Sequence, residues 1–133
     1  MPRFWSALTT ADFAQIDTAC AIAVLPVGTT EQHGPHLPLS VDADIAHAIV
    51  QAAAPLVADE VPAFFLPVQA IGYSPEHAHF VGTLTLRTET ALRLWSDIAE
   101  SVAASGVRKL VLFNTHNGNT SLLDNDRDRK SVV

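Results

Sequence analysis

Carboxylate and imidazole side chains lie close together in a polar segment in the first third of the chain. Glu31 and His33 stand two residues apart within residues 28–36. In an extended segment, side chains at this spacing point to the same side. One carboxylate and one imidazole on the same side suit a borderline divalent cation such as zinc or manganese. The pair therefore indicates a metal site, although a Glu-x-His pair in a loop is by itself a weak signal.

Two further side chains are candidates for the same site. Asp42 lies where a predicted helix opens and can return a second carboxylate, while His116 follows an apolar segment that predicts a strand. Both also have a purely structural interpretation. Aspartate at a helix start, here Asp42 or Asp44, commonly caps the helix, and His116 can be a hydrogen-bonded loop residue. The same structural interpretation applies to the remaining histidines, which are His36, His47, His77 and His79. His47 falls inside a predicted helix.

The elements that must position these residues alternate along the chain. Short continuous apolar runs are typical of buried strands, and they occur at 21–27, 61–68 and 110–113, with a brief extended piece at 83–86. Apolar residues recur at helical spacing between and beyond them, which predicts helices at 43–58 and 88–105 and a short one at 10–19 opened by Thr9 or Thr10. Gly106 stands where a helix C-terminal cap is expected.

Strands that are apolar on both faces and alternate with helices predict an α/β fold, a mostly parallel sheet sandwiched by helices. In such folds, sites gather beyond the carboxyl ends of the strands. The polar, histidine-containing segments follow directly after the three predicted strands, at 28–36, 70–82 and 114–119. We therefore expect these segments to meet at one end of the sheet.

Composition excludes several classes of protein. The 133 residues fit one domain, and 48% hydrophobic residues supply a core. With a net charge of −6 and only 8 Lys plus Arg, the chain has no basic stripe for nucleic acid. No stretch approaches the about 20 apolar residues that span a membrane. The single cysteine, Cys20, excludes an internal disulfide, is expected to be a small core residue, and is consistent with a cytoplasmic location.

Three segments, taken together, resemble the signatures of the creatininase (creatinine amidohydrolase) family. The first is Leu25 to Leu39 followed by Val41-Asp42, the second is Gly72 to Leu86, and the third is Asn114 to Asn119. They occur in the order that the family has, and the resemblance extends to about Asp124. Three ordered motifs of this length are far more specific than one metal-like pair.

The resemblance implies an amidohydrolase with two divalent metal ions, which are zinc, manganese or iron. Glu31 and His116 would bind one ion, His33 would bind the other, and Asp42 would bridge them. His77 and His79 would line the substrate side, and no catalytic residue is assigned. A metal-activated water would attack a small cyclic or linear non-peptide amide. Homo-oligomers are a further expectation for a full-length member.

The sequence also departs from the family pattern. Gly118 stands where creatinine-hydrolysing members have a metal-ligating glutamate, which argues against creatinine as the substrate. Related members take this last ligand from a motif well downstream, which this sequence lacks. We therefore expect residues 1–127 to be the N-terminal part of a single creatininase-like domain, truncated at its C-terminus, and 128–133 to be a non-native tail. An inactive fragment and a non-catalytic metal-binding module remain the alternatives.

Overall fold

A parallel sheet with strand order β2-β1-β3 forms the centre of the molecule. The structure is a computed structural model that describes residues 1–129, so most of the predicted non-native tail lies outside the described residues. The strands are β1 (Ile22–Val27), β2 (Ala63–Phe65) and β3 (Lys109–Asn114). β1 is central and pairs with β3 over its whole length, from Ile22 opposite Lys109 to Val27 opposite Asn114.

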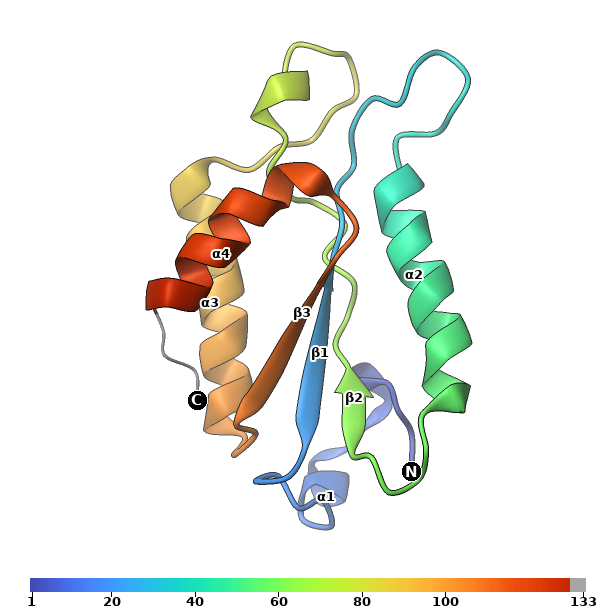
Figure 1. Ribbon diagram of the computed structural model, residues 1–133, viewed down its shortest axis with the longest axis vertical. Coiled ribbons are helices and arrows are strands. Elements are labelled where there is room, and N and C mark those ends of the chain that lie inside the picture. The colour runs from blue at the N-terminus through green and yellow to red at the C-terminus, as the bar shows by residue number, and fades with distance from the viewer. Residues whose placement is uncertain (130–133) are drawn as a thin grey trace.

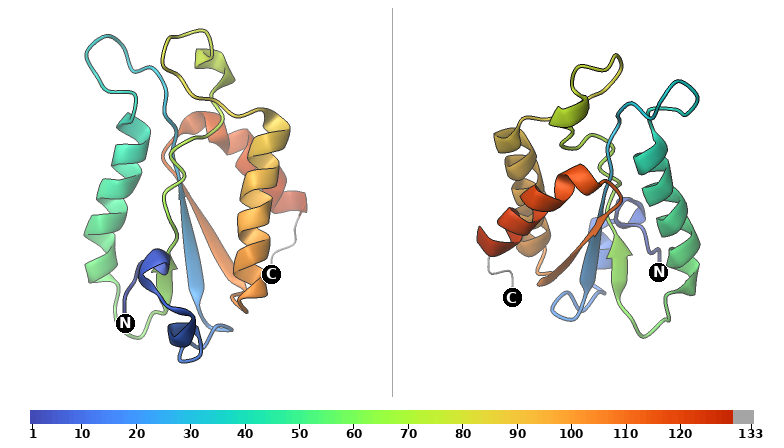
Figure 2. Two further views of the ribbon diagram at one scale, coloured as in Figure 1. Left: turned by 180° about the vertical axis from the view of Figure 1, so that it is seen from behind. Right: turned by 45° about the horizontal axis from the view of Figure 1, so that its top comes forward.

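Helices cover both faces of this sheet, which confirms the predicted α/β sandwich (Figure 1). α2 (Val41–Ala53) lies on one face, and α3 (Thr88–Ala104) and α4 (Thr120–Arg129) lie on the other, while the single turn of α1 (Thr10–Phe13) lies near the start of β1 (Figure 1). Because side chains alternate along a strand, β1 serves two apolar clusters. Leu25 packs in the cluster that contains Trp95 of α3, and Val24 packs in the cluster that contains Val50 of α2. α4 lies beside α3 in both views of Figure 2.

Two local predictions need correction. β2 covers only 63–65 of the predicted 61–68. Pro62 precedes it, and beyond Leu66, which donates to the Val24 carbonyl, the next donor position on β1 is Pro26, which has no N–H for the sheet ladder. α1 ends at Phe13, after one turn opened by a capping box between Thr9 and Asp12. The brief extended piece predicted at 83–86 is present as two isolated bridges, from Leu84 to Thr30 and from Thr85 to Gly72.

Cys20 was expected in the core, but it is exposed. It belongs to the turn that precedes β1, and its backbone N–H donates to the Asp17 carbonyl at 3.1 Å. A side-chain hydrogen bond with Asp17 raises the pKa of the Cys20 thiol. The first fully buried residue of this region is Ala21, so the apolar run begins one position after the cysteine.

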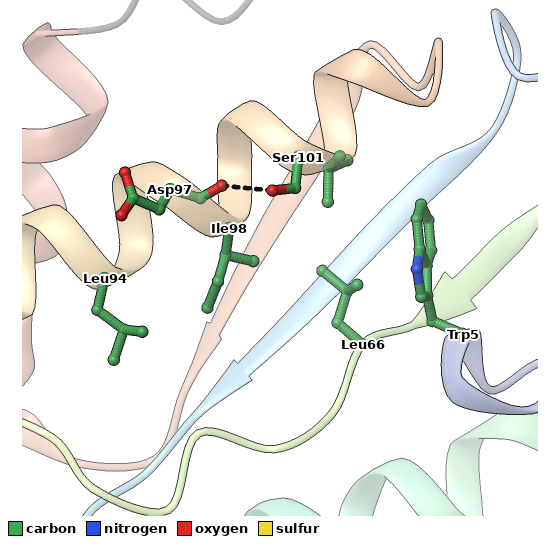
Figure 3. Close-up of a pocket in the computed structure, with 7 residues that line it drawn as sticks. Trp5, Leu66, Leu94, Asp97, Ile98 and Ser101 are labelled. Carbon is green, nitrogen blue, oxygen red and sulfur yellow. Dashed lines mark hydrogen bonds between the residues drawn. The ribbon is translucent and has the colours of Figure 1, made fainter.

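α3 ends where the sequence predicted, since Gly106 follows it with a φ of +94°, in the left-handed region that favours glycine. None of the helices in residues 1–129 is long and apolar enough to cross a membrane. An apolar pocket of about 270 Å³ lies along α3 (Figure 3). Its lining includes Trp5, Leu66 and Ile98 and contains none of the predicted metal ligands.

The segments that follow the three strands lie at the same end of the sheet (Figure 1). α2 also begins at this end, with Asp42 and Asp44 in its first turn. The topology therefore brings together the polar segments that the sequence analysis selected, as expected for a parallel sheet.

Candidate metal centre

Glu31, Asp42 and His116 meet at this end of the sheet and are all buried. Glu31 comes from the loop after β1, Asp42 from the first turn of α2, and His116 from the segment after β3. The His116 Nδ1 atom lies 3.2 Å from Glu31 Oε1 and 3.0 Å from Asp42 Oδ2. Potential ligand atoms of all three residues lie within 4.8 Å of one another. The structure therefore places three of the four predicted ligands in one buried cluster.

His33 reaches the same cluster through Asp42. Its Nε2 atom lies 3.2 Å from Asp42 Oδ1, whereas Asp42 Oδ2 faces His116. Asp42 thus presents one oxygen to each imidazole, which is the placement that a bridging carboxylate requires. The Thr115 hydroxyl holds the start of α2 in position, because it donates to the Asp42 backbone carbonyl at 2.7 Å.

Backbone carbonyls orient both imidazole rings. The Nδ1 atom of His33 lies 3.0 Å from the Glu31 carbonyl oxygen, and the Nε2 atom of His116 lies 3.0 Å from the Tyr73 carbonyl oxygen. A carbonyl can only accept, so each of these ring nitrogens carries the proton. In a neutral ring the opposite nitrogen then presents its lone pair to carboxylate oxygens, a repulsive contact that a proton on the ring or a cation bound by both groups relieves. This donor set fits a divalent cation, with a carbonyl fixing each histidine as is usual for metal ligands.

Ser74 supports Glu31 from the loop after β2. Its side chain is fully buried, and its hydroxyl donates to Glu31 Oε2. The Ser74 backbone N–H in turn donates to the Thr85 hydroxyl at 2.8 Å. Sequence reasoning did not select Ser74, because a single serine in a polar loop carries no signal of its own.

Asn119 ties together the three loops that carry the centre. Its side chain is fully buried. Its Oδ1 atom accepts from the Tyr73 backbone N–H at 2.9 Å, and its Nδ2 donates to the Gly28 carbonyl at 3.0 Å and to Asn114 Oδ1 at 3.2 Å. One side chain therefore fixes the carbonyl-bearing Tyr73 relative to both the β1 and β3 loops. Its role was not evident in the sequence.

Asn119→Ala is expected to destabilise the chain by about 1–3 kcal/mol, because it leaves buried backbone groups without hydrogen-bond partners. Asn117→Ala is the matched control, since Asn117 is exposed two positions earlier and is expected to change stability by less than about 0.5 kcal/mol. Urea denaturation followed by circular dichroism measures both variants. Equal midpoints for the two variants would contradict this role of Asn119.

The structure separates the two predicted substrate-side histidines. His77 ends the short 3-10 helix Pro75–His77, and its Nε2 atom lies 3.9 Å from Glu31 Oε2. His79 is exposed, and its ring centroid lies 4.4 Å from that of Phe80. His77 therefore borders the metal cluster, while His79 lies on an exposed part of the loop.

Glu76 is a further carboxylate at the centre that the sequence analysis did not select. Its side chain is half exposed, and its Oε1 atom lies 4.0 Å from His116 Nε2. Glu31, Glu76 and His77 can bring one ligand atom each within 4.8 Å of one another. Contacts between loops that are distant in the sequence bring Glu76 beside His116 and Glu31. Its residue type and spacing therefore did not mark it as a candidate for the metal centre.

Gly118 closes the centre from the β3 side. A Cβ atom at this position would lie 2.5 Å from His116 Nε2 and 2.9 Å from both Glu76 Oε1 and the Tyr73 carbonyl oxygen. These distances are too short for any side chain without movement of its neighbours. The glycine therefore permits the hydrogen bond between Tyr73 and His116.

Fold and site together define an α/β protein with a buried cluster of histidine and carboxylate groups suited to a divalent metal. A family model described as creatininase, creatinine amidohydrolase, matches residues 6–126. The chain therefore belongs to the creatininase family of amidohydrolases.

Solved structures of the family share this fold. A structure described as "Creatininase Mn" has a TM-score of 0.84 and 30% sequence identity, and the match covers 97% of this chain and 51% of that one. A creatininase mutant of Zn-Zn type gives a TM-score of 0.83, 30% identity and the same coverage. These manganese and zinc forms, with the acidic and histidine cluster, support divalent metal binding.

Curated relatives include both peptidases and a creatinine amidohydrolase. The mycofactocin precursor peptide peptidase of Mycobacterium tuberculosis is 38% identical over 122 residues, which cover 87% of this chain and 48% of that protein. The creatinine amidohydrolase of Pseudomonas putida is 31% identical over 115 residues, covering 83% and 43%. The chain thus spans about half the length of the curated relatives it matches.

Proposed function

We propose that this chain carries the metal-binding part of an enzyme that hydrolyses an amide C–N bond with a metal-activated water. The observation that supports this most directly is the arrangement of His33 and His116. In each ring, one nitrogen contacts a backbone carbonyl oxygen and the other contacts a carboxylate oxygen of Asp42. Backbone carbonyls commonly orient metal-ligating histidines in this way, which supports a metal site around this carboxylate.

Two divalent ions are proposed, and Asp42 would be a ligand common to both. Glu31 and His116 would hold the first ion, and His33 the second. Zinc, manganese and iron all accept carboxylate and imidazole ligands. When bound, such ions supply Lewis acidity and lower the pKa of a coordinated water towards neutrality.

Buried residues hold the ligands in place. Ser74 and Asn119 are fully buried, and Glu31 is only 4% exposed. Electrostatic interactions are stronger where water is excluded. Ser74 holds the Glu31 carboxylate and Thr115 holds the first turn of α2, so the ligands need little rearrangement on binding metal.

For the substrate, we propose a small cyclic or linear amide. Creatinine itself is disfavoured, because Gly118 leaves no room for a ligand side chain at that position. A peptide amide is the second candidate class, favoured by the peptidase names of relatives that are 36–38% identical. Parallel assays with a cyclic amide, a formamide and a short peptide distinguish these classes. An oligomeric assembly remains a proposal for a longer form of the protein.

The first test of the proposal is metal binding by the chain itself. After loading with zinc or manganese and dialysis, elemental analysis is expected to find two ions per chain. Binding to the native state alone adds about 2.7 kcal/mol to the unfolding free energy at a free metal concentration 100 times Kd. A chelator is expected to remove this gain. A chain that retains no metal and gains no stability would contradict the proposal.

Activity supplies the second measurement. Amide turnover by the protein is expected to disappear in chelator and to return with zinc or manganese. Turnover that survives thorough chelation would count against metal-assisted hydrolysis. Tight stoichiometric metal binding without turnover of any of the three substrate classes would favour a non-catalytic metal-binding module.

A further inference from the structure

Three histidines border the centre. Each has one ring nitrogen that faces the carboxylates and a second that faces away from them, and the three differ in what this second nitrogen contacts. His33 and His116 each place that nitrogen on a backbone carbonyl oxygen, an acceptor. His77 instead places its Nδ1 atom 3.0 Å from the amide nitrogen of Gln32, which can only donate. The partner of the second nitrogen decides which nitrogen of a neutral imidazole carries the proton.

The orientation of the Gln32 amide is fixed by a second contact. Its Oε1 atom accepts from the Gly34 backbone N–H at 2.9 Å. Rotating the amide by 180° would place its NH2 group against that N–H, two donors facing each other. The NH2 group therefore faces His77 Nδ1, which must accept. Neutral His77 then carries its proton on Nε2, the nitrogen that faces the metal cluster.

Glu31 does not accept a hydrogen bond from the His77 Nε2–H group. The Nε2 atom lies 3.9 Å from Glu31 Oε2, beyond hydrogen-bond distance, and that oxygen already accepts from Ser74. The His77 side chain is 29% exposed, and its ring lies against Phe80 with 5.8 Å between centroids. A donor is thus held beside the metal ligands on a side that solvent reaches.

We propose that Gln32 holds His77 as a hydrogen-bond donor to the carbonyl oxygen of the amide substrate, and that His77 is not a metal ligand. This rests on the proposed amide hydrolysis. Negative charge develops on that oxygen as the amide is attacked, and a preorganised N–H donor stabilises it. Gln32 is the positioning residue, since it acts through His77.

The competing interpretation is a further cation site made by Glu31, Glu76 and His77, whose ligand atoms approach within 4.8 Å. Coordination through Nε2 requires a lone pair on that atom and therefore the proton on Nδ1. Gln32 would then have to turn its amide oxygen towards His77, and the hydrogen bond from the Gly34 backbone N–H to that oxygen would be lost. The two interpretations predict opposite tautomers of one ring.

Long-range 1H–15N NMR of the histidine side chains measures the tautomer without any need for turnover. The chain is labelled with 15N-histidine and recorded at mildly alkaline pH, before and after zinc addition. We expect His77 to keep a protonated Nε2 in both states, while the 15N shifts of His33 and His116 change with zinc. Protonation of His77 on Nδ1, or zinc coordination through Nε2, would overturn the proposal.

Gln32→Glu is expected to invert the His77 tautomer, because a carboxylate accepts from Nδ1–H and leaves Nε2 as an acceptor. Gln51→Glu is the matched control, since Gln51 is exposed on α2 and introduces the same charge. The control should leave the His77 spectrum unchanged. An uninverted His77 in Gln32→Glu would show that Gln32 does not set the tautomer and would refute its positioning role.

His77→Ala separates this proposal from the metal function. We expect its zinc content to equal that of the unmodified chain, whereas the cation-site interpretation predicts loss of one equivalent. In a preparation that hydrolyses an amide, kcat is expected to fall about 100-fold with less change in KM. His77→Gln should recover part of this loss, because it restores an N–H donor. If the unmodified chain bound no metal at all, the proposed function would be refuted. The His77 tautomer, which NMR measures without metal, would still stand or fall on its own spectrum.

Discussion

Asp42→Asn is expected to weaken zinc or manganese binding about 1,000-fold, which exceeds the roughly 10–100-fold loss typical of a residue outside the ligand shell. Asp42 has a carboxylate oxygen on each of two imidazoles, at 3.2 Å from His33 Nε2 and 3.0 Å from His116 Nδ1. Asparagine preserves the size but removes the charge and replaces one oxygen by an NH2 group, which does not bind cations. Both proposed ions are expected to be lost together, because the proposed site has Asp42 as a ligand common to both.

Titration calorimetry and metal analysis after dialysis measure the effect. Asp44→Asn is the matched control, because Asp44 lies in the same first turn of α2, is exposed, and contacts the Ser40 hydroxyl at 2.6 Å. We expect the control to bind metal as the unmodified chain does. If Asp42→Asn retained two ions with unchanged affinity, Asp42 would be a structural helix-start residue and the bridging role would be wrong.

Gly118→Glu is expected to reduce metal affinity about 10–100-fold, although it introduces the residue type that the family resemblance implies for creatinine-hydrolysing members. A side chain here begins 2.5 Å from His116 Nε2 and 2.9 Å from the Tyr73 carbonyl oxygen. The hydrogen bond between these groups must break, and it is this bond that orients His116. Overpacking of a filled site also destabilises the fold by about 1–3 kcal/mol.

Asn117→Glu is the control for Gly118→Glu, because it adds the same charge at an exposed neighbouring position. Metal affinity and urea midpoint are measured for both variants. We expect only Gly118→Glu to lose affinity and stability. Tighter metal binding by Gly118→Glu would mean that the loop adapts and that the new carboxylate becomes a ligand. That outcome would contradict the fixed geometry derived for Tyr73 and His116.

Much of the fold could be predicted because its determinants are local. Helical spacing of apolar residues predicted 88–105, and α3 spans 88–104. The apolar run at 21–27 predicted β1, which spans 22–27. The strand predicted at 61–68 was too long, since Pro62 and, on the paired strand β1, Pro26 supply no N–H for the ladder. Which strand lies in the middle of the sheet was not readable from any local pattern.

The sequence by itself determined the side chains available for the centre. Glu31, His33, Asp42 and His116 were selected by residue type, spacing and position after apolar runs, and these are properties of short segments. Because parallel strands end at one edge of a sheet, their meeting also followed from the predicted fold. Residue type and spacing alone gave only a weak Glu-x-His pair and two residues with a structural interpretation, and it was the family resemblance of the same segments that made the set a credible metal site.

Only the tertiary structure decided how each group at the centre is held and protonated. Ser74 and Glu31 are 43 residues apart, as are Tyr73 and His116, yet each pair is hydrogen-bonded. Contacts between loops also bring in Glu76, leave no room at Gly118, and give His77 a donor where the other two histidines have acceptors. Hydrogen bonds act over about 3 Å, so these roles depend on how the loops pack, which local sequence patterns do not specify.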